Sequence, residues 1–137
     1  MLPVHATTIR LFLHVLAAAV WVGGQIALAA IVPVARRLGG PDVTRAVARR
    51  FQLVAWPAFA VLIATGVWNL VAVTVGDQSG RYLTTLFVKL VLVGVSGACA
   101  FAHILVARRR PAVGGALAGL ALLAALGATF LGVVLGG

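Results

Sequence analysis

The chemistry open to this sequence depends on a few polar side chains that interrupt long apolar stretches. An ionisable or amide side chain inside a lipid bilayer is costly unless it finds a partner, so such residues are the first place to look for function. They are His14, Gln25, Asn69, Lys89, Ser96, Cys99 and His103. Because neutral imidazole is the commonest side-chain ligand of metals and also ligates haem iron, His14 is the first candidate for a metal or haem ligand.

The remaining residues limit which metal site one chain can build. His14 and His103 differ in depth by about 24 Å along the expected helices, too far apart for both to ligate one haem. Cu(I) prefers Cys and Met ligands, but Met1 is the only methionine and Cys99, the only cysteine, lies well below His14. A closed copper site within one chain is therefore not expected, and a second haem ligand would be Lys89, water or a second subunit.

The elements that position these residues are long apolar helices. Hydrophobic residues make up 63% of the chain, charged residues 9%, and the mean hydropathy is +1.15. A helix needs about 20 apolar residues to span a bilayer. Four stretches qualify, at about 9–34, 51–75, 82–107 and 112–135. The short connections favour antiparallel neighbours, so we expect an all-α integral membrane protein in which residues 1–137 form one antiparallel up-down four-helix bundle.

Basic residues orient the expected bundle. The first connection holds Arg36, Arg37, Arg45, Arg49 and Arg50, the third holds Arg108, Arg109 and Arg110, and the second holds only Arg81 beside Asp77. Arginine-rich loops stay in the cytoplasm. We therefore expect a multi-pass protein of the cytoplasmic (inner) membrane with both termini extracytoplasmic. The arginines are interpreted as topology signals that contact the lipid bilayer and not as a nucleic-acid surface.

Depth counting brings three of the polar side chains to one layer. At about 1.5 Å per residue, His14, Asn69 and Lys89 each lie about 8–11 Å below the outer boundary. Trp21 and Gln25 follow His14 at helical spacing and share its face. The adjacent Gly23 and Gly24 leave a gap that would admit a neighbouring helix or a flat ligand.

Each of these residues also has a purely structural interpretation. Lys89 would snorkel its ammonium group to the outer surface. His14 would be a packed histidine that bonds to a carbonyl on a neighbouring helix, and Asn69 would join two helices by a hydrogen bond. The chain has no acidic residue inside an apolar stretch, no Ser-His-Asp set and no glycine loop after a strand, which excludes hydrolase and nucleotide-binding functions.

The motifs of the first three stretches resemble the copper resistance protein D (CopD) domain. His14 to Gly24 is similar to its His-x6-Trp-x-Gly-Gly opening, Thr65-Gly66 to Asn69 to its second helix, and Leu86-Phe-Val-Lys89 to its third. The resemblance implies copper uptake or tolerance, with copper held by His14 in an outer-leaflet site. Trp21, Gly23, Gly24, Asn69 and Lys89 would line that site. The implied partner is a copper-binding periplasmic or extracellular protein. A homodimer is expected on a separate ground, because one chain offers too few ligands for a closed site.

Two alternatives to copper handling stay open. The wider group includes the HemJ-type protoporphyrinogen oxidases, which bind haem b through a first-helix histidine. That resemblance implies a redox enzyme with His14 as axial ligand and Lys89 near a propionate, although Ala100 stands where that family has a further histidine. The second alternative is a small accessory subunit that binds no ligand and docks through Gly115 and Gly119. A non-enzymatic function is favoured over the enzyme.

Overall fold

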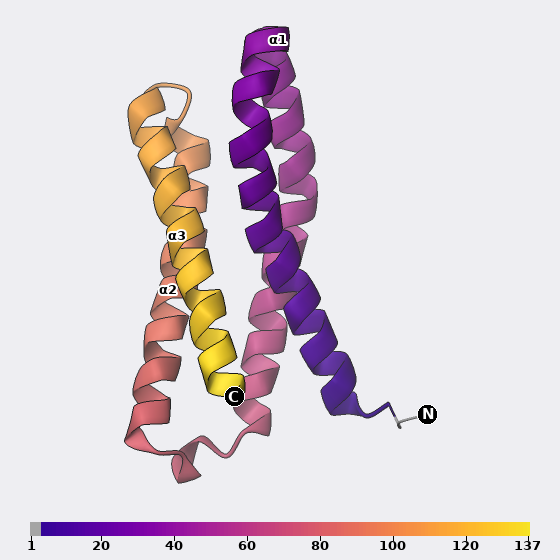
Figure 1. The fold of residues 1–137 in the computed structure, drawn as a ribbon, viewed down its shortest axis with the longest axis vertical. Coiled ribbons are helices and arrows are strands. Elements are labelled where there is room, and N and C mark those ends of the chain that lie inside the picture. The colour runs from indigo at the N-terminus through magenta and orange to yellow at the C-terminus, as the bar shows by residue number, and fades with distance from the viewer. Residues whose placement is uncertain (1–3) are drawn as a thin grey trace. The chain divides into compact units, whose positions relative to one another are not determined.

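Three long helices make up the fold. The computed structural model describes residues 4–137 (Figure 1). Along the chain these residues form helix α1 (Ala6–Ala72), a short 3-10 turn η1 (Val75–Asp77), helix α2 (Gly80–Val106) and helix α3 (Pro111–Gly136), and no strand lies among them. Each of the three helices is long and apolar enough to cross a membrane. The prediction of an all-helical protein with membrane-spanning helices is confirmed at this level.

The number of helices differs from the expected four. Residues 35–50, expected to be a connection, are helical and belong to α1, whose backbone leaves helical geometry only at Gly40, with φ 68° and ψ −165°. At Gly40 the helix turns back on itself, so α1 is a hairpin with a first arm (6–39) and a second arm (41–72) (Figure 1). Arginine and alanine are good helix formers, which explains why the arginine-rich segment is helical right up to this single glycine.

Local side-chain chemistry explains why the reversal lies at Gly40. A positive φ is readily adopted by glycine and costly for other residues, and Pro41 starts the next arm where its missing N–H costs nothing. Thr44 Oγ1 donates to Gly40 O at 2.9 Å, and Arg45 Nη2 donates to Asp42 Oδ1 at 2.6 Å. These contacts hold the first turns of the second arm.

The chain divides into two compact units, residues 1–74 and residues 75–137. In the first, an aromatic cluster joins the arms of α1: the Trp21 ring centroid lies 4.4 Å from that of Phe59 and 5.5 Å from that of Trp56. Trp21 is almost fully buried, at 3% exposure. Gly24 lies against the ring of Phe51 so closely that a Cβ atom there would overlap it. Large aromatic rings opposite glycine therefore set the spacing of the hairpin.

The second unit is an antiparallel pair formed by α2 and α3. Ser79 caps α2 by accepting from the Tyr82 N–H at 3.3 Å. Small residues of α3 are buried, namely Ala121, Ala124, Ala125 and Ala128. The buried Ser96 Oγ donates to Ala121 O at 2.8 Å across the pair. Small interfacial residues with an occasional hydroxyl are typical of helices that pack in lipid, where close approach replaces the hydrophobic effect.

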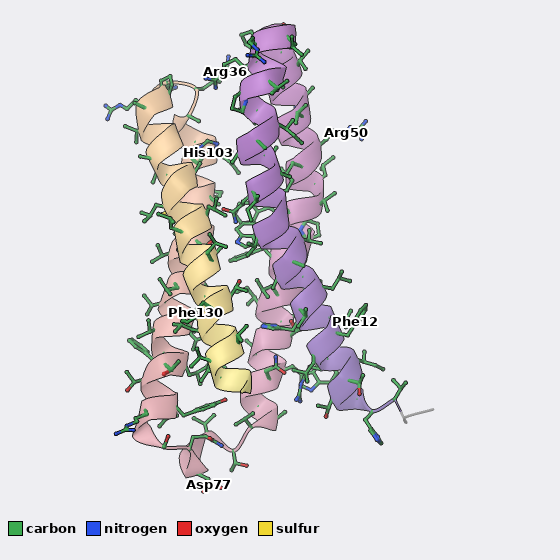
Figure 2. The ribbon with its side chains drawn as sticks, viewed as in Figure 1. Phe12, Arg36, Arg50, Asp77, His103 and Phe130 are labelled. Atoms are coloured by element: carbon green, nitrogen blue, oxygen red, sulfur yellow. The ribbon has the colours of Figure 1, made fainter. Side chains whose placement is uncertain are left out.

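The outer surface of the helices is apolar. Large side chains such as Phe12, Phe87, Leu123 and Phe130 are each more than 60% exposed, and Figure 2 shows Phe12 and Phe130 directed away from their helices. Continuous apolar surface of this kind is rare on a soluble monomer and is expected of a surface that faces lipid. The helices are therefore those of a membrane-embedded protein, while the choice of membrane and the outward position of the termini stay predictions.

Candidate metal site

His14 is held by a hydrogen bond between the two arms of α1. Its Nδ1 lies 2.9 Å from Oγ1 of Thr65, which is buried on the second arm. The Thr65 hydroxyl donates its own proton to backbone carbonyls one turn back, to Val61 O at 2.7 Å with Leu62 O at 3.2 Å. A hydroxyl has one proton, so towards His14 it accepts, and the imidazole proton is assigned to Nδ1.

This assignment determines which ring nitrogen suits a metal. With the proton on Nδ1, the lone pair of the neutral imidazole belongs to Nε2. Histidines that ligate metals usually donate their other N–H to a fixed acceptor, which selects the tautomer and orients the ring. The Thr65 hydroxyl is such an acceptor. The tautomer that this contact selects is compatible with a metal at Nε2.

Gly66 leaves room for the imidazole against the second arm. A Cβ atom added at Gly66 would lie 3.6 Å from His14 Cε1, an ordinary van der Waals distance, so a side chain larger than alanine would meet the ring. Both residues therefore contribute to the position of the His14 ring. Thr65 accepts its hydrogen bond, and Gly66 has no side chain that would occupy the space beside it. Sequence reasoning quoted this pair only for its resemblance and assigned Thr65 no role, because threonines inside helices commonly bond to their own backbone.

One turn towards the open end of the hairpin, two polar side chains have a buried atom without a hydrogen-bond partner among residues 4–137. These atoms are Nε of Arg10 and Oδ1 of Asn69. The His14 to Thr65 contact sets the register of the arms, and each of the two residues lies four positions beyond it on its own arm. A buried unsatisfied donor or acceptor needs a water molecule or a ligand. Arg10 is thus a candidate site residue that sequence reasoning missed because it stands at the edge of the apolar stretch.

The other expected site-lining residues of α1 lie on the Gly40 side of His14. Trp21 lies seven residues along the first arm, about 10 Å away at helical rise, and packs in the aromatic cluster. Gln25 Nε2 donates to the Trp21 carbonyl at 3.2 Å on the same arm. The Phe51 ring occupies the space beside Gly24, whereas a Cβ atom at Gly23 would meet nothing within 4 Å. Trp21 and Gly24 therefore join the arms, and only Gly23 leaves open space.

Lys89 belongs to the second unit and lies against α3. A Cβ atom added at Gly132 would lie 3.2 Å from Lys89 Nζ and 3.6 Å from its Cε, so the side chain occupies the room that this glycine provides. The structure thus brings Asn69 to within a turn of the His14 level in the first unit and places Lys89 over Gly132 in the second. The layer expected to join all three stays a prediction.

The polar residues at the opposite end of the second unit have structural partners. His103 Nδ1 donates to the Gly114 carbonyl at 2.7 Å and so joins α2 to α3 where the two helices meet their connection. Cys99, a free thiol, lies one helical turn before it. Across residues 4–137, no group of three or more His, Cys, Asp or Glu residues is arranged to hold a metal ion. A metal at His14 would therefore be completed by other donor types or from outside the chain.

Comparison with known proteins adds no relative. No protein family, curated protein or solved structure matches this chain at a significant level. The copper and haem hypotheses therefore depend on the quoted motifs and on the chemistry around His14.

Proposed function

We propose that this chain is a membrane protein that handles copper, with His14 Nε2 as the principal copper ligand. The observation that carries the proposal is the chain of hydrogen bonds from His14 Nδ1 through the Thr65 hydroxyl to the Val61 carbonyl. It orients the ring and assigns the lone pair to Nε2 before any metal arrives. Copper ligation through Nε2 requires this tautomer, and the Thr65 contact supplies it.

Asn69 supplies a second donor of suitable chemistry. Its Oδ1 is buried without a hydrogen-bond partner in the described chain and lies one turn beyond the His14 level. Imidazole nitrogen with an amide or water oxygen is a donor set that Cu(II) accepts. A site with so few protein ligands binds weakly and exchanges its metal readily, which suits uptake or delivery better than storage. A periplasmic or extracellular copper protein, or a second copy of this chain, would complete the coordination shell.

Copper content of the purified protein tests this proposal. The protein is extracted in mild detergent and equilibrated with copper by dialysis, and the copper bound in excess of the outer buffer is measured by elemental analysis. We expect about one copper per chain in the unaltered protein, loss of that copper in His14→Ala, and a weakened site in Asn69→Leu. His103→Ala is the matched control, because His103 also donates from Nδ1 but to a backbone carbonyl in the second unit. Copper retained in His14→Ala, or lost equally in His103→Ala, would refute the proposal.

Haem b is the second candidate, and Arg10 is the observation that favours it. Porphyrin supplies four ligands to its iron, so one axial histidine from a chain suffices. The buried, unpartnered Nε of Arg10 lies one turn from His14, and guanidinium groups pair well with carboxylates such as haem propionates. The residues present therefore fit a haem held by His14 and Arg10, which would provide one-electron chemistry when bound. A Soret band that is lost in His14→Ala and weakened in Arg10→Gln, without bound copper, would establish this alternative.

A further inference from the structure

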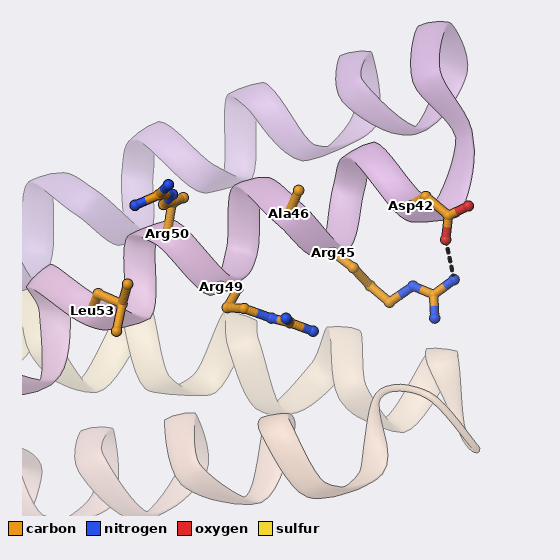
Figure 3. A pocket seen from close by; sticks show the side chains of 6 residues that line it. All are labelled: Asp42, Arg45, Ala46, Arg49, Arg50 and Leu53. Atoms are coloured by element: carbon orange, nitrogen blue, oxygen red, sulfur yellow. Dashed lines mark hydrogen bonds and ion pairs between the residues drawn. The ribbon is translucent and has the colours of Figure 1, made fainter.

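The second arm of α1 has a hollow directly after the reversal at Gly40. Its volume is about 500 Å³, and it is lined by Asp42, Arg45, Ala46, Arg49, Arg50 and Leu53 (Figure 3). Intervals of three and four residues place these side chains on one side of the helix. The hollow therefore combines guanidinium groups with apolar side chains on a single helical face.

Charge in this hollow is strongly unbalanced. Asp42 accepts from Arg45 at 2.6 Å, and this is the one ion pair found among residues 4–137 (Figure 3). Arg49 and Arg50 are exposed and have no acidic partner in that part of the chain. The hollow is therefore lined by two guanidinium groups, on successive residues, whose positive charges no acidic side chain in residues 4–137 neutralises. Such a site favours a ligand with at least one full negative charge.

The lining of the same hollow is partly apolar. Leu53, the lining residue furthest from the reversal, is 65% exposed, and Ala46 also lines the hollow. A free phosphate ion would use the arginines and gain nothing from these side chains. An amphiphile with a phosphate head and a hydrocarbon chain would use both. The side chains are therefore suited to a lipid and less suited to a soluble anion or a nucleic acid.

The second unit has the same combination on a different element. Near the end of α2, a hollow of about 520 Å³ is lined by Ile104, Leu105, Arg108 and Arg109. Both arginines are exposed, and no acidic residue lines this hollow. Leu105 is 63% exposed. Paired arginines beside exposed aliphatic side chains thus occur independently in the two units, near the start of the second arm of α1 in one and just after the end of α2 in the other.

We propose that each of these two arginine pockets binds one anionic phospholipid. The headgroup phosphate pairs with a guanidinium group that lines each pocket, from Arg49 or Arg50 in one and from Arg108 or Arg109 in the other. One acyl chain follows the aliphatic side chains of the same pocket. Guanidinium forms two parallel hydrogen bonds to phosphate, a geometry that matches a lipid headgroup phosphate. A headgroup with net negative charge is favoured over a zwitterionic one, whose own ammonium group would compete for the phosphate.

Lipid titration of the purified protein tests the proposal. Phosphatidylglycerol is added to the protein in a neutral detergent, and bound lipids are counted by native mass spectrometry. Phosphatidylcholine tests the headgroup charge, and glycerol 3-phosphate tests whether the headgroup binds without acyl chains. The first pocket is altered in Arg49→Gln/Arg50→Gln. The matched control is Arg36→Gln/Arg37→Gln, which removes the same charge from the first arm, outside the pocket. Circular dichroism confirms that both variants are helical.

We expect two phosphatidylglycerol molecules per chain and much weaker binding of phosphatidylcholine. Each arginine near an anionic headgroup contributes about fivefold, so Arg49→Gln/Arg50→Gln should weaken one binding event about 25-fold. The control should change neither event by more than about twofold. Equal loss in both variants would show general charge attraction and overturn the proposal. Binding of glycerol 3-phosphate as tight as that of the lipid would also overturn it, in favour of a soluble phosphate site.

Discussion

Replacing Thr65 with valine tests the assignment of the His14 proton. Valine has nearly the shape of threonine, so the change leaves no cavity and removes only the hydroxyl that lies 2.9 Å from His14 Nδ1. A net hydrogen bond contributes about 1 kcal/mol, and a half-buried N–H left without a partner raises the cost towards about 3 kcal/mol. Hydrogen bonds between helices in lipid are weaker and average about 0.6 kcal/mol. We therefore expect Thr65→Val to lower the stability by about 1 kcal/mol, near the lower end of this range.

The larger effect should be on metal affinity. Without the Thr65 acceptor the hydrogen bond that holds the imidazole proton on Nδ1 is lost. Loss of the partner that orients a metal-bound histidine typically costs about 10–100-fold in affinity. Competition with a copper chelator of known affinity measures this change, and thermal unfolding in detergent measures the stability.

Two further variants separate the hydrogen bond from general damage. Thr65→Ser restores a hydroxyl and should recover most of the affinity. Thr129→Val removes a hydroxyl that bonds only to its own helix, at 2.9 Å to Ala125 O, and should leave affinity unchanged. The assignment is wrong if Thr65→Val binds copper as tightly as the unaltered protein while His14→Ala loses it.

Three further changes test the packing, each followed by thermal unfolding in detergent. Gly40→Ala should destabilise the reversal of α1 by about 1–3 kcal/mol because φ 68° with ψ −165° is a backbone conformation open essentially only to glycine; equal stability would show that the turn tolerates side chains. Gly24→Ala should cost about 1–3 kcal/mol because the new Cβ atom overlaps the Phe51 ring, whereas Gly23→Ala, with nothing within 4 Å, should be nearly neutral; similar costs would contradict this packing. Ser96→Ala should cost about 1 kcal/mol through loss of a 2.8 Å hydrogen bond to a carbonyl of α3, and an unchanged midpoint would mean that this bond adds nothing.

The helices of the second unit follow closely from sequence, whereas the first reversal does not. Helices expected at about 82–107 and 112–135 are found at Gly80–Val106 and Pro111–Gly136. Apolar composition limits their length, and Ser79 and Pro111 supply ordinary start signals. The prediction of a connection at residues 35–50 was wrong because the arginines there were interpreted as loop residues. In the folded chain they continue the helix, and Gly40 alone, through its positive φ, makes the turn.

The sequence by itself identified the candidate site residues, because a polar side chain inside an apolar stretch costs free energy in a membrane and is easily recognised in the sequence. His14 and Asn69 were found in this way. Tertiary structure alone decided what His14 contacts, because a hydrogen bond between residues 51 positions apart depends on the register of two arms. That register gave His14 its Thr65 partner, placed Arg10 and Asn69 one turn beyond it, and placed Trp21 in the packing between the arms. The assignment of the imidazole proton to Nδ1, on which the proposed copper site depends, follows from that contact.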